Sequence, residues 1–358
     1  MATPESQYDT SAPVLVTGAT GYVAGWLIRR LLEEGFTVHA AVRDPGNASK
    51  VGHLTKMASD LNGDLKLFAA DLLDEGSYTE AMQDCSVVFH TASPFINSVE
   101  DPQRDLVDPA LIGTRNVLET VNGVPSVRRV VVTSSCAAIY GDGADCARAP
   151  GGTLTEDIWN TTSSIGHNAY SYSKTLAERA AWDIAEAQSR WKLVTINPSL
   201  VLGPALNAKP TSESFNLIAQ AGNGAMKSGV PKIEIGAVDV RDVAEAHMLA
   251  GFVEDAAGRY ITSARTISFL EVGQALAAHF GDGWPFPRRE MPKWLIWLAG
   301  PMVNKAFTRR WVSANVGHPW KADNSRSVRD LGMTYRPLDV AAVEMFQQMI
   351  DTGKVKKR

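Results

Sequence analysis

The fold of this chain is decided by one stretch, Val14-Leu15-Val16-Thr17-Gly18-Ala19-Thr20-Gly21-Tyr22-Val23-Ala24-Gly25. Apolar strand-forming residues run into a glycine-spaced turn, and the segment that leaves it, 26–32, has the apolar spacing of a helix. A strand, a tight turn and a helix in this order form the context that a dinucleotide-binding fingerprint requires. Gly18 suits the turn, Gly21 lets the backbone approach a pyrophosphate, and Ala24 lets helix and strand pack closely.

Length and composition narrow the class of protein. A chain of 358 residues is longer than one average domain, and its net charge of −4 lacks the basic footprint of a nucleic-acid-binding protein. The start has no signal-peptide pattern and no apolar run is long enough to span a membrane, so we expect a cytoplasmic protein, monomeric or homodimeric. The predicted division is a nucleotide-binding domain over 11–197 plus 236–264, a substrate lobe over 198–235 plus 265–345, and flexible termini at 1–10 and 350–358.

The cysteines and histidines do not indicate metal chemistry. Three cysteines and seven histidines are scattered without the spacing of metal ligands, so we predict no metal site. An odd and small number of cysteines also argues against a disulfide framework. We interpret Cys136 as a small buried residue rather than a redox-sensitive thiol.

The end of the second predicted strand, 37–42, bears on the choice of cofactor. NAD-selective sites place a carboxylate there for the ribose 2′-hydroxyl, whereas NADP-selective sites use a cation for the 2′-phosphate. Here Arg43 follows the strand and Lys50 comes seven residues later. A guanidinium suits a phosphate because it forms charge-assisted, bidentate bonds. Asp44 has two alternatives, an ion pair with Arg43 or a contact with the ribose. We predict NADPH/NADP+ as the cofactor.

Further strands and helices alternate along the chain, and side chains that suit chemistry stand at the strand ends. The predicted strands are 65–69, 87–90, 130–135, 193–196, 238–240 and 260–262, and the predicted helices are 111–120, 168–187, 211–221, 243–250 and 269–279. Asp71 either caps a helix or contacts the adenine, and Asp242 is predicted as the N-cap of the helix at 243–250. We interpret His90 as a packed core histidine rather than a base. Ser135 ends the fifth strand, where open α/β sheets place their chemistry.

Tyr170 and Lys174 open the helix predicted at 168–187. They are four residues apart and share a helical face, whereas Tyr172 and Lys174 do not. Reduction of a carbonyl leaves an alkoxide that needs a proton, and a phenol can supply it if a cation lowers its pKa from about 10. We therefore predict Tyr170 as the proton donor, Lys174 as the cation beside it and Ser135 as the hydrogen-bond donor to the carbonyl.

In this order, Thr17-Gly18-x-x-Gly21, Ser135, Tyr170 and Lys174 resemble the extended short-chain dehydrogenase/reductase family over nearly the whole chain. Val42-Arg43-Asp44-Pro45 and Val201-Leu202-Gly203-Pro204 are similar to its dihydroflavonol and cinnamoyl-CoA reductase branch. The resemblance implies a Rossmann-type doubly wound parallel sheet with a smaller C-terminal α/β substrate lobe. The cofactor-binding residues assigned from it are Thr17, Gly18, Thr20, Gly21, Tyr22, Val23, Arg43, Lys50, Asp71, Leu72, Thr91, Ala92, Ser93, Thr133, Tyr170, Lys174, Pro198, Val201 and Ser214.

Departures from that branch bear on the substrate. Tyr140 stands where dihydroflavonol reductases carry a flavonoid-sorting asparagine, and Ala169 and Ser171 flank Tyr170 where cinnamoyl-CoA reductases carry Trp and Cys. The chain looks closest to the yeast methylglyoxal/isovaleraldehyde reductase group, which implies NADPH-dependent reduction of a small aldehyde or ketone. The alternatives are a hydroxysteroid dehydrogenase or sugar-nucleotide epimerase/dehydratase of the same fold, and a non-catalytic NADP(H)-binding protein.

A Trp-rich region runs from Trp284 to Trp320 and includes the apolar block 294–299. Such a block either contacts a membrane surface or a subunit, or lines a substrate lobe or its core. The second is commoner, and we expect it here. We also expect Phe95, Tyr140 and the segment 205–212 around the substrate.

Overall fold

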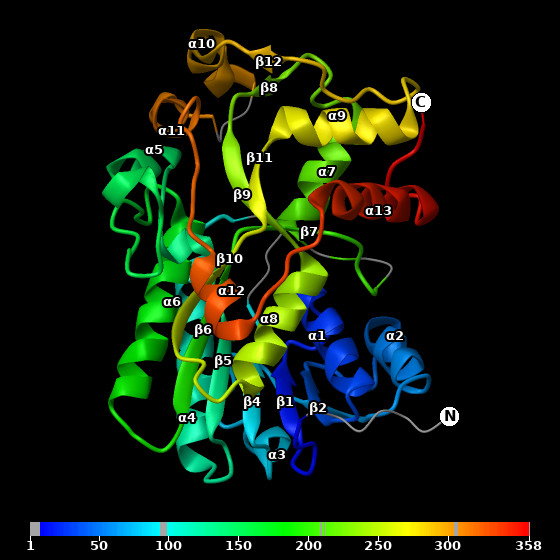
Figure 1. Cartoon of the computed structure of the whole chain (residues 1–358), viewed down its shortest axis with the longest axis vertical. Coiled ribbons are helices and arrows are strands. Elements are labelled where there is room, and N and C mark those ends of the chain that lie inside the picture. The colour runs from blue at the N-terminus through cyan, green and yellow to red at the C-terminus, as the bar shows by residue number, and fades with distance from the viewer. Residues whose placement is uncertain (1–7, 94–98, 208–209, 211, 304–306, 358) are drawn as a thin grey trace.

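The computed structural model describes residues 8–93, 99–207, 210, 212–303 and 307–357. Its main feature is a seven-stranded sheet with the order β10-β6-β5-β4-β1-β2-β3, in which all neighbouring strands are parallel (Figure 1). The strands are β1 Val14–Thr17, β2 Thr37–Val42, β3 Asp64–Ala69, β4 Val87–His90, β5 Arg129–Thr133, β6 Lys192–Pro198 and β10 Gly258–Thr262.

Successive strand residues supply two cores, one on each face of this sheet. Val14 and Val16 belong to the core that includes α1, α2 and α8, whereas Leu15 between them belongs to the core that includes α3, α4 and α6. These helices are α1 Tyr22–Glu33, α2 Ala48–Ala58, α3 Thr79–Met82, α4 Asp108–Gly123, α6 Ala169–Glu186 and α8 Val240–Phe252. Helices on both faces of a parallel sheet confirm the predicted doubly wound α/β fold.

A further core lies toward the end of the molecule opposite the parallel sheet (Figure 1). We call it the second core, to distinguish it from the cores on the two faces of the parallel sheet. It is built around a three-stranded sheet with the order β11-β9-β7. The elements are β7 Leu200–Leu202, β9 Glu234–Asp239, β11 Arg265–Ser268, α7 Glu213–Asn223, α9 Phe269–Phe280 and α13 Leu338–Asp351. Val355 is 4% exposed in this core, so the tail that we expected to be flexible is packed at that point. The domain boundaries given above remain a proposal.

The remaining elements are shorter, and some of them lie at the far end of the molecule. They are α5 Gly143–Arg148, β8 Val230–Pro231, β12 Glu290–Met291, α10 Lys293–Val303, α11 Arg309–Asn315, α12 Ser325–Leu331, a π-helical turn at Gln103–Val107 and 3-10 turns at Cys136–Ala138 and Pro150–Gly152. Leu331 at the end of α12 packs into the core that includes α1 and α8. None of the helices, within the described residues, is long and apolar enough to cross a membrane.

The N-cap prediction for Asp242 is wrong. The helix α8 begins at Val240, and the side chain of Asp239 caps it by accepting a hydrogen bond from the Arg241 amide at 2.8 Å. Asp242 is fully buried inside the first turn and pairs with Arg336, whose backbone amide also donates to it at 2.8 Å. Acidic residues are favoured both at the cap and in the first turn, so the local sequence does not distinguish the two positions.

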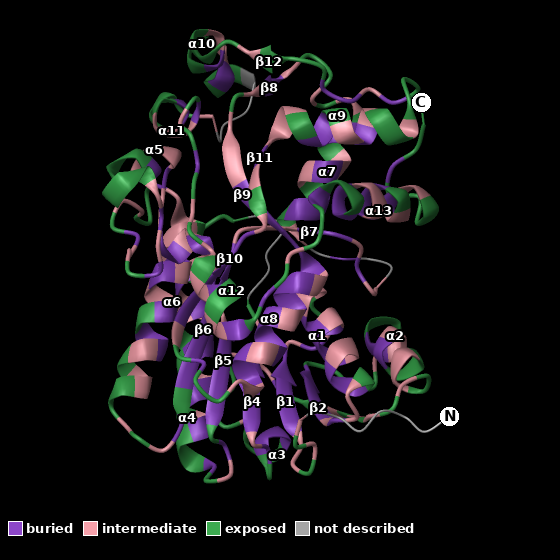
Figure 2. Ribbon diagram, viewed as in Figure 1, coloured by how far each residue is buried: buried purple, intermediate pink, exposed green. Residues whose placement is uncertain are grey.

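The expectation for the apolar block 294–299 is also wrong in part. Ile296 is buried, but Trp294 is 67% exposed and Leu298 is 55% exposed. Figure 2 shows α10 with both exposed and buried stretches. The tryptophans at the two ends of the Trp-rich region, Trp284 and Trp320, are buried. This region therefore contributes to the core at its ends and presents apolar side chains to solvent in its middle.

Gly18 occupies a position where no other residue fits without strain. Its φ is +63°, in the left-handed region, and a Cβ there would lie 2.7 Å from the Cα of Ala92. Ala92 follows β4, so this contact joins the ends of two neighbouring strands. A side chain at residue 18 would push them apart.

Replacing Gly18 with Ala is expected to lower the free energy of unfolding by about 2–4 kcal/mol, through backbone strain and overpacking. Chemical denaturation measures this. The matched control is Gly52→Ala in α2, where a Cβ meets nothing within 4 Å, and its stability is expected to be unchanged or higher by about 0.5–1 kcal/mol. Equal stabilities of the two variants would contradict the role given to Gly18.

Candidate active site

The carboxyl ends of β1 and β4 meet where the strand order reverses. Thr17 lies opposite His90 in the register, and its Oγ1 is 2.9 Å from His90 Nδ1. The same hydroxyl accepts from the Ala92 amide at 3.1 Å, and the Thr91 hydroxyl donates to the Thr17 carbonyl at 2.6 Å. Open α/β sheets bind their ligands in the crevice at this point. The structure therefore brings Thr17, Gly18, Thr91 and Ala92 together at one edge.

Two side chains that we set aside as non-catalytic are buried. His90 is 3% exposed, and burial, followed by the charge of Lys174, lowers its pKa to about 3. The pKa of the Cys136 thiol is raised by burial, and Sγ donates to the Asn197 carbonyl at 3.2 Å. Both are packed residues, as the sequence indicated.

The start of α1 suits an anion. Its first turn holds no acidic residue, and no side chain caps it. Gly21, the N-cap, is exposed. The amide groups at a helix start have no partner within the helix, and they carry the positive end of its dipole. A pyrophosphate placed there would receive hydrogen bonds from the backbone.

The loop that follows β7 is hydrogen-bonded to the glycine turn and to the first residue of α1. The Tyr22 hydroxyl donates to the Gly203 carbonyl at 2.6 Å, and Asn207 Nδ2 donates to the Thr20 carbonyl at 3.2 Å. Tyr22 is one of the predicted cofactor residues, and its hydroxyl is thus hydrogen-bonded to a backbone carbonyl of the protein. The loop links the second core to the glycine turn.

Arg43 and Lys50 are exposed beyond the end of β2, at the same edge of the sheet as Gly18. Neither forms an ion pair with any residue in the described part of the chain. Asp44 does not pair with Arg43; its carboxylate accepts from the Gly46 amide at 3.0 Å. Arg43 is therefore a cation that is open to a phosphate.

The segment after β3 also lies at this edge. Asp71 caps no helix, because α3 begins only at Thr79. Its carboxylate accepts from the Leu73 amide at 2.9 Å, and the neighbouring Leu72 carbonyl accepts from Asn116 at 2.8 Å. A narrow recess is lined by Leu72, Ala92, Ser93 and Lys174, among others. Predicted cofactor residues that follow β3 and β4 thus border α6.

Ser135 begins the 3-10 turn after β5, and its Oγ accepts from the Ala137 amide at 3.1 Å. The side chain of Ser135 also acts on Tyr170, whose pKa it lowers. At the end of β6, Asn197 Nδ2 donates to the Ser135 carbonyl at 3.2 Å. The structure therefore brings together the predicted serine and Tyr170, the tyrosine that shares a helical face with Lys174.

Lys174 follows Tyr170 by one turn of α6. Its Nζ is 5.9 Å from the centroid of the Tyr170 ring and donates to Ser93 Oγ at 3.0 Å. Burial lowers its pKa to about 8, and the Glu178 carboxylate acts in the opposite direction. This ammonium connects α6 with the residues that follow β4.

The prediction that Lys174 lowers the pKa of Tyr170 is wrong for the chain by itself. The pKa of Tyr170 is raised, first by burial; the side chain of Ser135 lowers it and the charge of Glu213 raises it. The Tyr170 residue as a whole is 52% exposed at the surface. Lys174 has little effect because its ammonium is directed to Ser93. A phenol with a raised pKa holds its proton at neutral pH, as a proton donor must.

Behind this site lies a buried ion pair between Glu178 and Arg259. Glu178 Oε1 accepts from Arg259 Nε at 2.6 Å, and the two residues are 1% and 6% exposed. The carboxylate also accepts from Asn197 at 2.8 Å, Thr195 at 3.1 Å and the hydroxyl of Ser134. The pair therefore joins α6 to the ends of β5, β6 and β10.

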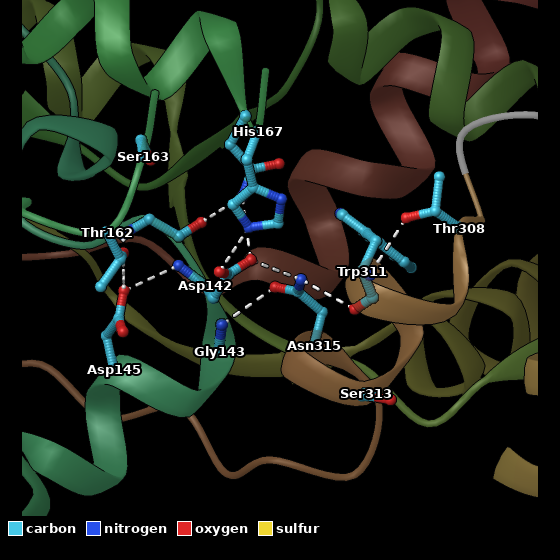
Figure 3. Close-up of polar contacts among 12 residues, drawn as sticks. Asp142, Gly143, Asp145, Thr162, Ser163, His167, Thr308, Trp311, Ser313 and Asn315 are labelled. Atoms are coloured by element: carbon cyan, nitrogen blue, oxygen red, sulfur yellow. Dashed lines mark hydrogen bonds and ion pairs between the residues drawn. The ribbon is translucent and has the colours of Figure 1, made fainter. Parts of the chain in front are cut away.

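Asp142 fixes the start of α6 (Figure 3). Asn168, directly before the helix, has a φ of +56°, and its Nδ2 donates to Asp142 Oδ1 at 2.9 Å. The same carboxylate accepts from Asn315 of α11 at 2.7 Å and lies 2.6 Å from His167 Nε2. Asparagine tolerates left-handed backbone. These bonds set the position from which Tyr170 projects and tie it to α11.

The remaining predicted cofactor residues occupy two places. Thr133 and Pro198 end β5 and β6, at the same edge as Ser135, and the Thr133 hydroxyl is 2.6 Å from His247 Nε2. Val201 and Ser214 belong to β7 and α7 of the second core. Phe95, which we expected near the substrate, lies outside the described residues.

Sequence reasoning missed the buried residues that support the site. Tyr170, Lys174 and Glu178 follow one another at intervals of four, and this polar stripe on a helix was a signal that pointed to Glu178. Arg259 is separated from Glu178 by 81 residues, and no local pattern indicates it. Asn197 and His247 likewise become visible as partners only in the folded chain.

Replacing Glu178 with Ala is expected to lower the free energy of unfolding by about 3–5 kcal/mol, because Arg259 would remain buried without its counter-ion. Denaturant titration measures this change. The control is Glu186→Ala at the exposed end of the same helix, where the expected change lies within about 0.5 kcal/mol. A loss below about 1 kcal/mol for Glu178→Ala would mean that the pair is dispensable.

Comparisons with known proteins agree with this arrangement. Residues 14–259 match the NAD dependent epimerase/dehydratase family. Cinnamoyl-CoA reductase CAD2 of Medicago truncatula is 37% identical over 342 residues, 94% of this chain and 95% of that protein. Tetraketide alpha-pyrone reductase 1 of Arabidopsis thaliana is 38% identical over 77% of this chain and 83% of that protein.

A solved structure with a similar fold carries a cofactor. The yeast methylglyoxal/isovaleraldehyde reductase Gre2, complexed with NADPH, has a TM-score of 0.75 and 25% identity to this chain, over 96% of this chain and 100% of that one. The sequence match and the likeness of fold cover the glycine turn, the strand-end serine and the Tyr-Lys helix together. This chain belongs to the NAD dependent epimerase/dehydratase family, the extended short-chain dehydrogenases/reductases.

Proposed function

We propose that this chain catalyses the NADPH-dependent reduction of an aldehyde or ketone to an alcohol. One observation carries the proposal: the side chain of Ser135 acts on Tyr170 and lowers its pKa, and the Lys174 ammonium lies 5.9 Å from the centre of the Tyr170 ring. Two neighbouring hydroxyls at the carboxyl edge of a parallel sheet suit one oxygen atom of a substrate, because the serine can polarise the carbonyl and the tyrosine can protonate it.

The residues at the carboxyl edge of the parallel sheet are suited to bind NADPH. The uncapped start of α1 suits the pyrophosphate, and Gly18 is a position where a Cβ would displace Ala92. Arg43, exposed and without an ion pair in the described chain, would hold the 2′-phosphate. Lys174 and Ser93 would hold the nicotinamide ribose. The relative Gre2 was solved with NADPH, which supports the same choice here.

In the proposed reaction the bound NADPH supplies a hydride to the carbonyl carbon. The Ser135 hydroxyl donates a hydrogen bond to the carbonyl oxygen and stabilises the negative charge that develops there. Tyr170 gives its proton to that oxygen, and a phenolate remains. Ser135 stabilises this phenolate, because its side chain lowers the pKa of Tyr170, while the Lys174 ammonium would hold the cofactor beside it. Asp142 and Glu178 keep the three side chains in position.

Replacing Tyr170 with Phe is expected to lower kcat at least about 100-fold, because the proton donor is lost, while the Kd for NADPH stays within about twofold. NADPH consumption with a panel of aliphatic, aromatic and keto-ester carbonyls gives the first quantity, and cofactor fluorescence titration gives the second. The control is Tyr172→Phe on the same helix, which is expected to keep its activity. A Tyr170→Phe variant that retains more than about a tenth of the activity would contradict the assignment.

Replacing Arg43 with Ala is expected to weaken NADPH binding about 10- to 100-fold and to leave NADH binding nearly unchanged, because only NADPH carries the 2′-phosphate. Titration of the two cofactors measures this selectivity. Arg29→Ala is the control, since Arg29 is paired with Glu33 on the surface of α1. Equal losses for NADPH and NADH would show that Arg43 does not contact the phosphate.

A further inference from the structure

The helix α10 exposes a complete apolar stripe, which we call the outer face of α10. It consists of Trp294, Trp297, Leu298, Pro301 and Met302. The spacing is i, i+3, i+4, i+7 and i+8, which places all five on one side of a helix. In most globular proteins such a stripe faces the core. Here the four large side chains are between 39% and 90% exposed.

The opposite side of α10 already has a partner. Ile296 packs with Val312 and Val316 in a small cluster, and Gly300 is buried as well. The helix is therefore held in place by one side and leaves the other without a covering element in the described chain. Elsewhere the large exposed apolar side chains of the described residues lie on separate elements, such as Leu73, Ile112 and Val340. Single exposed residues of this kind are ordinary, but a contiguous patch marks an interaction surface.

The charges in the segment that contains α10 are mostly positive. Between Trp284 and Trp320 the chain has six Lys or Arg residues and one acidic residue, Glu290, although the chain as a whole carries −4. The guanidinium of Arg309 lies 4.7 Å from the centre of the Trp297 ring, at the border of the stripe. Lys293 begins the helix, and Arg310 is exposed beside Arg309. An apolar helical face with tryptophans and a basic border is typical of helices that lie in the interface of an anionic membrane.

The position of α10 allows such contact. Figure 1 shows it at one extreme of the long axis of the molecule, beside β12, and far from the parallel sheet. A flat surface can reach a helix at this place without meeting the nucleotide-binding domain. The helix has 11 residues, which is too short to span a bilayer. It can only lie along the surface.

We propose that the outer face of α10 docks on the surface of an anionic lipid bilayer. Trp294, Leu298 and Met302 enter the boundary between headgroups and acyl chains, and the basic side chains around them contact lipid phosphates. Buried apolar area and electrostatic attraction then add, so binding requires both the stripe and the anionic lipid. This docking is separate from the proposed reduction, because no residue of the stripe belongs to the candidate active site.

The test is flotation of the full chain with phosphatidylcholine vesicles that contain phosphatidylserine, compared with phosphatidylcholine alone. The wild type is expected to float with the anionic vesicles, and less so as salt is added. The double variant Trp294→Glu/Leu298→Glu and the charge variant Arg309→Glu/Arg310→Glu are each expected to bind at least about tenfold more weakly. Leu73→Glu is the control, since Leu73 is 57% exposed beyond β3 and is expected to leave binding unchanged.

Light scattering and thermal unfolding complete the experiment. Both multiple variants change exposed residues, so unfolding midpoints near that of the wild type are expected; if one variant unfolds, the other still tests the proposal. The proposal is overturned if the wild type does not float with anionic vesicles, or if both variants float as well as the wild type. It is also overturned if the wild type is a dimer that Trp294→Glu/Leu298→Glu converts to monomers, because the stripe is then a subunit interface.

Discussion

A buried ion pair between Glu178 and Arg259 holds α6 against the parallel sheet. A buried pair is not by itself a strong source of stability, because removing two charges from water costs about as much as their attraction returns. Here the ion pair matters because its hydrogen bonds set the orientation of α6 and β10. The carboxylate accepts from side chains that follow β5 and lie on β6, and the guanidinium donates to the carbonyls of Glu156 and Ile158. The bonds of the carboxylate hold α6 against β5 and β6, and the bonds of the guanidinium hold β10 to the segment that precedes α6.

The glycine turn imposes the second constraint. The ends of β1 and β4 approach so closely that a single Cβ at residue 18 would collide with Ala92. No side chain caps the start of α1, and hydrogen bonds of Tyr22 and Asn207 join the loop that follows β7 to the same turn. The candidate cofactor site and the second core are therefore connected through hydrogen bonds to backbone carbonyls. A backbone carbonyl can accept such a bond whatever side chain its residue carries.

Local pattern was sufficient for elements whose cause is local. The strand predicted at 37–42 has the bounds of β2, and Tyr170 rather than Tyr172 reaches Ser135, because spacing on a helix determines which side chains share a face. The errors have causes at long range. Asp242 is engaged by Arg336, which is distant in the sequence, and the pKa of Tyr170 follows from the burial of its hydroxyl. The exposed side of α10 could not be predicted either, because an apolar stripe has the same spacing whether protein or solvent faces it.

Burial is the largest cause of the pKa shifts of Tyr170 and Lys174, and the shift of Lys174 affects the stability of the fold. Burial disfavours the charged form of both groups, so the pKa of Tyr170 is raised and that of Lys174 is lowered to about 8. Because the folded pKa of Lys174 lies below its unfolded value of 10.5, the cation destabilises the fold below about pH 8, and this cost disappears as the pH rises through the interval between the two values. The Glu178 carboxylate reduces the cost by raising the pKa of Lys174. The same carboxylate that holds α6 against the sheet thus also favours the ammonium form of Lys174, which is the form that would contact the nicotinamide ribose in the proposed function.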